Sequence, residues 1–348
     1  MSKILILKND RVGDLFHSLR GIYSIIESNQ RNGHCNIEII LSNFSKEMSF
    51  LFKTKNIKIS FLNYNLSIFN KFYLLKKIFQ NNYDKIYILS PKNFYFYFPL
   101  ITKSKIYAIT VKDFKRERPN NFLKKKLYKY YINDRTNKKL GDSISNLIER
   151  LCNEYSLKIS PLPNNINNKI SNPLKQNFNL LKKNNFIHVH YKNSLFTKNG
   201  WSLESFVDLL NKILKTKIYD GISSNVHPKI LLSSDIGNND YNNYFLKKFS
   251  YINFDNEETK FLNSNIIYLH NIKINDLFEI ISHAHHVISP HGTMTVMASY
   301  LNRKVVDIYD VTISKNSFRE FKPHNKNYNF LILKNSSYKI KNKIINFL

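Results

Sequence analysis

The first residues that could carry chemistry lie where the first apolar run ends. Residues 3–8 read KILILK, which is typical of a buried strand, and segment 15–27 is typical of an amphipathic helix. Between them Gly13 permits a tight turn, and Asp14 stands where a helix N-terminus keeps a carboxylate ionised at neutral pH. Such a carboxylate can accept a proton from a sugar hydroxyl. The alternative is that Asp14 is only a helix cap.

A second group of candidate residues follows the apolar segment 286–289. Pro290 ends that segment, and Gly292 and Thr293 open a predicted helix at 293–301. The first amides of a helix have no intrahelical partner and favour anions, so this N-terminus suits a nucleotide diphosphate. His291 stands beside it, either as a ligand-binding residue or as a loop histidine that faces solvent.

These residues must be positioned by the elements around them, and short β-branched runs alternate with longer amphipathic segments along the chain. The alternation predicts parallel sheets covered by helices on both faces. We expect strands at 3–8, 37–41, 57–62, 85–89, 105–110, 186–191, 229–233, 266–269, 286–289 and 304–309. We expect helices at 15–27, 66–79, 123–131, 143–155, 203–214, 241–249, 274–283 and 293–301.

The alternation is interrupted once, by a polar stretch rich in Asn and Pro. Its composition indicates a linker, which we place at 161–178, between an N-terminal domain at 1–160 and a C-terminal domain at 179–348. A length of 348 residues agrees with two domains. Ligands of open α/β sheets bind outside the carboxyl ends of the strands, so a cleft between the domains is the expected site.

Bulk composition excludes several classes of protein. The two cysteines, Cys35 and Cys152, form no disulfide framework, and no apolar run approaches about 20 residues. We therefore expect a cytoplasmic protein. The formal net charge of +28 has three interpretations: nucleic-acid binding, an anionic membrane surface, or a lysine-rich coding bias. The lysines are spread along the chain, which argues against specific nucleic-acid binding.

The N-terminal motif resembles glycosyltransferase family 9, the bacterial heptosyltransferases. Enzymes of this family begin with a strand, a short loop, Gly-Asp and a His-Ser/Thr-Leu stretch, and here residues 12–19 read VGDLFHSL. The resemblance implies a GT-B fold, in which two Rossmann-like domains with parallel sheets face each other across a cleft. It also implies that Asp14 is the catalytic base of an inverting transfer, and that Arg11 and His17 line the acceptor side. The alternative for His17 is a packed helix residue.

The resemblance extends to residues 192–202, KNSLFTKNGWS, where the family has a loop with hydroxyl residues and a Lys shortly before a Trp. It implies that Lys198, close to the single Trp201, faces the donor diphosphate, with Lys192, Ser194 and Thr197 as further candidates. The alternative is a basic surface loop. The turn and helix start at 290–295 resemble the family's donor-binding signature but depart from it at two positions. Pro290 stands where the family has Asp, and Thr295 stands where it has His. This departure puts the sugar in doubt.

Metal ligation and dinucleotide binding have little support. No GxGxxG follows the first strand, and no Asp-x-Asp pair is present after a strand. We place His188 and His190 on opposite faces of a strand, and His283, His285 and His286 lack helical ligand spacing. No metal and no cofactor are expected.

The predicted function is an inverting, metal-independent glycosyltransferase that uses a nucleotide-diphosphate sugar, carrying heptose or a related sugar. Its expected acceptor is a lipid-linked saccharide, such as lipopolysaccharide core, at the inner membrane. Basic residues of the first domain suit the acceptor's phosphates or form a solvated face: Lys112, Lys115, Arg116 and Arg118. The alternatives are a basic nucleic-acid-binding protein and a catalytically silent GT-B assembly partner.

Overall fold

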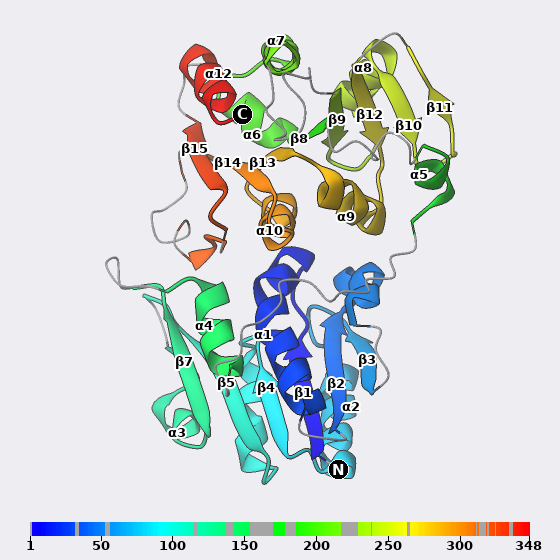
Figure 1. The fold of residues 1–348 in the computed structure, drawn as a ribbon. Helices are drawn as coiled ribbons and strands as arrows, with labels where there is room; N and C mark the ends of the chain where they lie inside the picture. Colours follow the sequence, from blue (N-terminus) through cyan, green and yellow to red (C-terminus); the bar gives the residue numbers. More distant parts are fainter. Residues whose placement is uncertain are drawn as a thin grey trace. The chain divides into compact units, whose positions relative to one another are not determined.

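The structure is a computed structural model of the 348-residue chain (Figure 1). It describes residues 2–31, 35–52, 56–114, 117–136, 142–153, 170–177, 186–216, 229–237, 239–262, 265–310, 312, 318, 320–323, 325–333 and 337–348. The chain divides into two compact units. Unit 1 comprises Met1–Asn167 with Ser314–Pro323, and unit 2 comprises Asn168–Ile313 with His324–Leu348.

Unit 1 is built on a mostly parallel sheet whose strand order is β3-β2-β1-β4-β5, with β6 and β7 both paired to β5. The chain fills one half of the sheet from β1 to β3 and then returns past β1 to fill the other half. Only β6 pairs in the antiparallel sense. The strands are β1 (Ser2–Lys8), β2 (Cys35–Ser42), β3 (Ile57–Leu62), β4 (Lys85–Ile88), β5 (Lys105–Lys112), β6 (Glu117–Arg118) and β7 (Lys129–Asp134).

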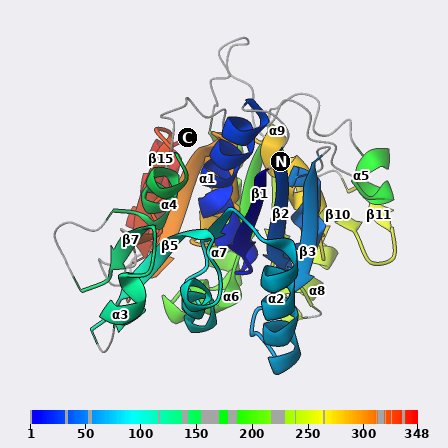
Figure 2. The ribbon, with the colours of Figure 1, turned by 90° about the horizontal axis from the view of Figure 1, so that it is seen from below.

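Helices cover both faces of this sheet, as the near-continuous apolar strands require. Figure 2 shows α1 and α4 on one face, and α2 and α3 on the other. The elements are α1 (Val12–Arg31), η1 (Asn43–Phe52), α2 (Ile68–Asn81), η2 (Asn93–Leu100), α3 (Asn121–Lys124) and α4 (Ile144–Cys152). One apolar core joins the strands to α2, η2 and α3 through Leu74, Ile78, Phe96, Phe98 and Leu123.

Unit 2 repeats the plan with the strand order β11-β10-β12-β9-β8-β13-β14-β15. All its pairs are parallel except that of β10 and β11. The strands are β8 (Phe186–Tyr191), β9 (Lys229–Ser234), β10 (Ser250–Asn253), β11 (Thr259–Lys260), β12 (Ile266–His270), β13 (His286–Pro290), β14 (Lys304–Asp310) and β15 (Tyr328–Leu333).

The helices of unit 2 also lie on both faces of their sheet, with α7, α8 and α12 on one face and α9 and α10 on the other (Figure 1). Tyr191, Trp201, Phe206 and Phe245 anchor the core beneath α7 and α8. The helices are α5 (Asn172–Gln176), α6 (Asn193–Lys198), α7 (Leu203–Lys215), α8 (Asp240–Lys248), α9 (Ile274–His283), α10 (Thr293–Tyr300) and α12 (Ser337–Asn346).

Three local expectations were wrong. The predicted helix 123–131 is the end of the short α3 followed by strand β7, because its Tyr-rich residues pair with β5. The predicted loop 192–202 contains helix α6. Segment 314–323 belongs to unit 1, although the sequence assigned all of 179–348 to one domain. Residues 161–169 and 178 of the predicted linker lie outside the described residues.

Candidate functional site

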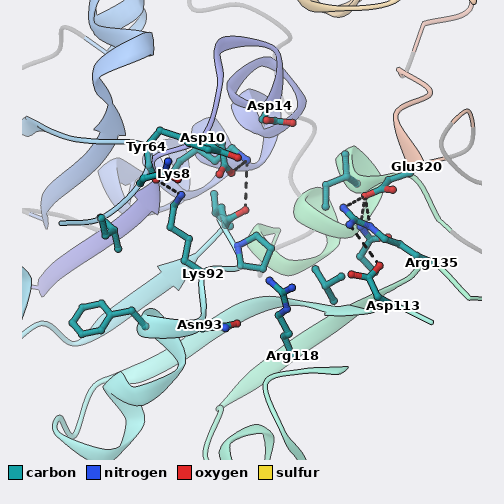
Figure 3. A pocket seen from close by; sticks show the side chains of 18 of the residues that line it. Lys8, Asp10, Asp14, Tyr64, Lys92, Asn93, Asp113, Arg118, Arg135 and Glu320 are labelled. Atoms are coloured by element: carbon teal, nitrogen blue, oxygen red, sulfur yellow. Dashed lines mark hydrogen bonds and ion pairs between the residues drawn. The ribbon is translucent and has the colours of Figure 1, made fainter. Parts of the chain in front are cut away.

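A pocket of about 670 Å³ lies in unit 1 where the chain reverses its order through the sheet, at the carboxyl ends of β1 and β4. Such a switch point is the usual ligand position in open α/β sheets. Its lining joins Lys8 of β1, Lys92 after β4, Asp113 after β5 and Asn133 of β7. Figure 3 shows Lys8, Lys92 and Asp113 around the pocket together with Asp14.

Asp14 lies in the first turn of α1 and lines the pocket as a half-buried carboxylate. Burial raises its pKa above 3.8, and nearby Asp10 adds to this effect, whereas Lys8 and the Arg11 backbone amide act in the lowering direction. The backbone amide at the start of α1 thus acts in the direction that the sequence predicted, but burial outweighs it, and the net shift of the Asp14 pKa is upward. A carboxylate with a raised pKa is a stronger base toward a hydroxyl proton.

Beside Asp14, Lys8 and Asp10 form an ion pair. Lys8 Nζ lies 2.9 Å from Asp10 Oδ2, and the hydroxyl of Ser90 donates to the same oxygen at 2.5 Å. Burial acts to raise the pKa of Asp10, but Lys8 and Ser90 lower it overall. Asp10 thus stays ionised as the partner of a buried lysine, and Asp14 is the carboxylate better suited to accept a proton.

Two cationic side chains of the lining have contacts that leave them available to an anion. Lys92 Nζ donates to the carbonyl of Tyr64 at 2.5 Å and lies 4.2 Å from the centre of the Tyr64 ring. Burial lowers the pKa of Lys92. Arg118, at the end of β6, points into the pocket (Figure 3), and its buried Nε has no hydrogen-bond partner among the residues that the structure describes.

The far wall of the pocket is closed by an ion pair from a distant part of the chain. Arg135 donates to Glu320 Oε1 through Nη2 at 2.6 Å and Nε at 3.0 Å, and Asn133 donates to the same oxygen at 2.7 Å. Arg135 also lies 3.6 Å from Asp113. These contacts fix Arg135 as part of the wall.

The other residues predicted for the acceptor side have different positions. Arg11 is exposed, and its guanidinium lies 5.8 Å from the centre of the Tyr64 ring, which lines the pocket. Gly13 lies inside the first turn of α1 and makes no turn of its own. His17 is buried and is not part of the pocket lining; its Nδ1 lies 2.8 Å from Ser145 Oγ of α4, and its ring centre lies 6.0 Å from that of Phe321, which lines the pocket. Arg116 lies outside the described residues.

In unit 2 the predicted donor residues gather at one edge of the sheet. Strands β8, β13 and β14 are adjacent and parallel, so residues 192–198 and 291–293, which follow β8 and β13, lie at the same sheet edge as 307–310, the last residues of β14. The chain reverses its order between β8 and β13. Lys192, Ser194 and Thr197 are exposed on or beside α6, and Thr197 hydrogen-bonds to Asn193.

Lys198 is not a free cation, because its Nζ lies 2.8 Å from Asp310 Oδ2 and 3.3 Å from Thr312 Oγ1. The ion pair joins the end of α6 to the end of β14. Side-chain donation by Lys198, with help from Thr312, lowers the pKa of Asp310. A diphosphate that engaged Lys198 would compete with a carboxylate already in place.

The N-terminus of α10 is also partly occupied by the protein itself. The amide of Gly292 donates to Thr295 Oγ1 at 3.2 Å, and that hydroxyl donates back to the Gly292 carbonyl at 3.0 Å. Thr295 is thus the hydrogen-bond acceptor of the Gly292 amide. The next amide, of Thr293, belongs to the first turn of the helix, where amides lack intrahelical acceptors.

His291 is held in place by a buried carboxylate. Its Nδ1 lies 2.8 Å from Asp307 Oδ2, and its ring stacks on Tyr309 with centroids 4.4 Å apart. Asp307 is fully buried, and Tyr328 donates to the same Oδ2 at 2.6 Å. No pattern in the sequence indicated that Asp307 orients His291.

The remaining histidines form no metal centre in the described ranges, where no group of three or more His, Cys, Asp or Glu could hold an ion. His188 and His190 both contact Ser233 Oγ at 3.0 Å. Their assignment to opposite strand faces was therefore wrong, because residues two apart share a face. Burial lowers the pKa of His188 to about 3 and that of His286 to about 3, so both stay neutral.

Some pocket residues could have been found from the sequence and others could not. Lys92 lies three residues after the end of a predicted strand, so the rule that ligands lie at carboxyl strand ends would have found it. Lys8 and Asp10 lie just before the 12–19 motif in the sequence. No sequence pattern predicts that Glu320 belongs to the pocket, because it lies almost two hundred residues away from its partners in the sequence.

No family model matches the chain, and no curated protein sequence matches it. Several solved structures are similar to the chain. Over 99% of its length the chain is similar to E. coli heptosyltransferase WaaC with ADP (12% identity, TM-score 0.62, 100% of that chain). Over 99% of its length it is also similar to a glycosyl transferase family 9 protein from Veillonella parvula (12% identity, TM-score 0.61, 89% of that chain). A third similar structure is that of a putative UDP-N-acetylglucosamine 2-epimerase from Listeria monocytogenes (7% identity, TM-score 0.55, 87% of that chain).

The comparisons confirm the expected fold. The chain has the GT-B fold, with two Rossmann-like units, that family 9 heptosyltransferases and the epimerase share. Identities of 7–12% extend the likeness to the fold alone. The WaaC structure contains ADP, and a second one contains ADP-2-deoxy-2-fluoro heptose. No helix in the described part of the chain is long and apolar enough to cross a membrane.

Proposed function

We propose that this protein is an inverting glycosyltransferase in which Asp14 is the catalytic base. The observation that carries the proposal is the position of Asp14, a half-buried carboxylate with a raised pKa that lines a pocket at the switch point of the unit 1 sheet. The fold is that of enzymes that transfer sugars from nucleotides, which supports the reaction class.

The reaction is a single displacement. Asp14 takes the proton of an acceptor hydroxyl, the oxygen forms a bond to the anomeric carbon of the donor, and the bond from that carbon to the diphosphate oxygen breaks. The nucleoside diphosphate leaves with the electron pair. The negative charge that develops on it is stabilised by the Thr293 amide, by His291 and by Lys192 or Lys198, so the step needs no metal.

The donor is a nucleotide-diphosphate sugar bound by unit 2, carrying heptose or a related sugar. Support comes from the E. coli structures solved with ADP and an ADP-heptose analogue. In the Gly292–Thr295 contact, Thr295 stands where the resemblance gives the family a His, so we expect the contacts that recognise the sugar to differ from the family's.

The acceptor is an anionic, lipid-linked saccharide, such as lipopolysaccharide core or another surface glycan, bound in the unit 1 pocket. Arg118, with its buried unpartnered Nε, and Lys92 suit a phosphate or carboxylate near the reacting hydroxyl. Lys112, considered from the sequence for the same task, pairs with Asp134 at 3.6 Å and is not part of the lining.

The test has two stages. A thermal-shift panel of nucleoside diphosphates, sugar nucleotides and duplex DNA should show stabilisation by one nucleotide diphosphate, because a ligand that binds only the native state raises Tm. Transfer from the matching sugar nucleotide to lipopolysaccharide-core acceptors is then measured for the wild type and for Asp14→Asn.

We expect Asp14→Asn to lose roughly 10²–10⁴-fold in kcat while it keeps the nucleotide-induced Tm shift. Asp113→Asn, at the other side of the same pocket, is the matched control and should retain most activity. Salt-sensitive stabilisation by DNA with no response to nucleotides would favour the nucleic-acid alternative. Nucleotide binding without transfer to any acceptor would favour the silent assembly partner.

A further inference from the structure

The helix α2 has apolar side chains on two opposite sides. Leu74 and Ile78 are buried in the unit 1 core. On the other side, Phe69 is 81% exposed, Phe72 64% and Phe79 60%. Positions 69, 72, 76 and 79 recur at helical spacing, so these side chains form one outward stripe. A surface helix normally turns polar residues outward, and an outward aromatic stripe indicates an unfilled contact.

The stripe continues onto the neighbouring elements. Leu74 and Ile78 of α2, Phe96 and Phe98 of η2, and Leu123 of α3 pack into the same core cluster, so these three elements cover one face of the sheet. Figure 2 shows α2 and α3 on that face, opposite α1 and α4. Their outward sides carry further exposed apolar residues, namely Ile68, Tyr97, Leu100, Phe122 and Tyr128. We call this surface the α2–η2–α3 face.

The charge on this face has one sign. Segments 66–81, 92–105 and 119–131, which form it, contain repeated lysines and no Asp or Glu. Lys76, Lys125 and Lys126 are exposed among the aromatic residues. Some cations lie over rings, as Lys71 Nζ does 5.9 Å from the centre of Phe94. Elsewhere the chain mixes signs, since it has 25 acidic residues in all.

We propose that the α2–η2–α3 face docks unit 1 on an anionic lipid surface. Aromatic side chains that enter the interface, combined with lysines that meet anionic headgroups, are the composition that such docking requires. A second copy that presented the same face would bring lysines against lysines, which disfavours a symmetric dimer. The lack of acidic residues also fits a uniformly negative surface better than a protein surface of mixed charge.

The docking face adjoins the candidate acceptor pocket. The pocket lining includes Leu66, just before α2, Lys71 in the first turns of α2, and Asn93 and Phe94 at the start of η2. The proposed function is the basis for one consequence: docking would hold the pocket beside the lipid that carries the acceptor. The docking itself does not depend on the reaction.

The test is co-sedimentation of the full chain with vesicles. Phosphatidylcholine vesicles are compared with vesicles in which about a third of the lipid is phosphatidylglycerol. We expect binding to the anionic vesicles, and a fall of roughly tenfold or more in the partition coefficient for Phe69→Ser/Phe72→Ser. Lys76→Gln/Lys125→Gln should weaken binding by several-fold, and less so at high salt.

Matched controls are Ile236→Ser/Phe261→Ser, which removes equally exposed apolar side chains of unit 2, and Lys247→Gln/Lys248→Gln. Both should bind as the wild type does. All substituted residues are exposed, and Tm verifies that each variant is folded. Equal binding by the Phe69/Phe72 variant and the wild type, or no binding to anionic vesicles, would overturn the proposal.

Two further measurements separate this proposal from its rivals. Light scattering without lipid that showed a dimer broken by Phe69→Ser/Phe72→Ser would assign the face to a second copy and overturn lipid docking. Transfer to a water-soluble, deacylated acceptor should be unchanged in that variant. If transfer is absent in every protein while vesicle binding follows the expected pattern, the proposed function fails and the docking face stands.

Discussion

At the scale of single residues, the two carboxylates near the end of β1 are driven in opposite directions. Burial raises the pKa of Asp14, whereas Lys8 and Ser90 outweigh burial and lower the pKa of Asp10. The two groups lie four residues apart, and the difference comes from the buried Lys8, which pairs with Asp10 at 2.9 Å. This division of roles, one fixed anion and one available base, is what a proton-abstracting site needs.

The first prediction concerns the acid limb of the pH–activity profile. A base must be ionised, so activity should fall as pH falls through the raised pKa of Asp14. The charge of Asp10 contributes to that raised pKa. Asp10→Asn should therefore move the acid limb of kcat to lower pH, and Asp113→Asn should not move it. The measurement is kcat against pH for the three proteins. An unmoved limb in Asp10→Asn would show that another group limits the rate.

The second prediction concerns stability, where the same two residues have opposite signs. A raised folded-state pKa means that ionised Asp14 disfavours folding above that pKa, so Asp14→Asn should raise Tm at pH 7. The lowered pKa of Asp10 contributes stability that is present above its unfolded-state pKa and is lost as pH falls through the folded-state value. Asp10→Asn should therefore lower Tm at pH 7, and it also leaves buried Lys8 unpaired. Calorimetry at pH 7 checks both signs, and a fall in Tm for both variants would contradict the prediction.

The third prediction concerns the donor side. Asp307 fixes the orientation and tautomer of His291 through Nδ1, with Tyr328 donating to the same oxygen. Asp307→Asn should weaken nucleoside-diphosphate binding about tenfold, near the effect of His291→Ala, whereas Tyr328→Phe should cost less. Titration calorimetry with the nucleotide found by the thermal-shift panel measures this. Wild-type affinity in Asp307→Asn, together with weak binding by His291→Ala, would exclude a positioning role.

At the scale of elements, α1 presents Asp14 because it packs closely on α4. A Cβ added at Gly21 would lie 2.8 Å from Ile148 Cγ2 and 3.2 Å from Cys152 Sγ, so the two helices approach where only glycine fits. The close approach of α1 and α4 also buries His17 against Ser145. The packing of this helix pair thus sets the direction of the helix that carries the candidate base.

The fourth prediction follows from this approach. Gly21→Ala should lower the free energy of unfolding by about 1–2 kcal/mol, because overpacking exceeds the gain of about 1 kcal/mol in helix propensity. Urea denaturation measures the loss. In the Ile148→Ala background, which removes the Cγ2 atom, the same substitution should cost clearly less. Equal costs in both backgrounds would place the strain elsewhere.

Element positions were largely predictable, because strands such as β1 and β8 are continuous apolar runs and α9 has clear helical periodicity. Strand β7 was not, since its Tyr- and Lys-rich sequence shows no apolar run, and only pairing with β5 makes it a strand. The same limit applies to the site. Asp14 and the 291–293 turn could be predicted from the local sequence. The contacts of Glu320 with Arg135, of Asp310 with Lys198 and of Asp307 with His291 could not, because they depend on tertiary structure.

At the scale of the whole molecule, the chain returns to unit 1 late. Segment 314–323 belongs to unit 1, although it is flanked on both sides by unit 2. Its Glu320 accepts hydrogen bonds from Arg135 and Asn133 at the pocket wall. The positive charge of Arg135 is favoured further by this contact, since Glu320 raises its pKa against the effect of burial. The pocket therefore depends on residues from both ends of the chain.

The fifth prediction tests this dependence with a reporter for each unit. The single tryptophan, Trp201, is buried in the unit 2 core, so its fluorescence reports the unfolding of unit 2, whereas circular dichroism reports both units. Glu320→Gln removes a charge-assisted partner of Arg135 and should lower the stability of unit 1 by about 1–3 kcal/mol. The dichroism transition should then begin at lower urea while the fluorescence transition stays in place. Glu257→Gln, at an exposed position of unit 2, is the control and should move neither. If Glu320→Gln shifts both transitions equally, the units unfold as one cooperative body, and the segment stabilises the whole molecule rather than the pocket-bearing unit alone.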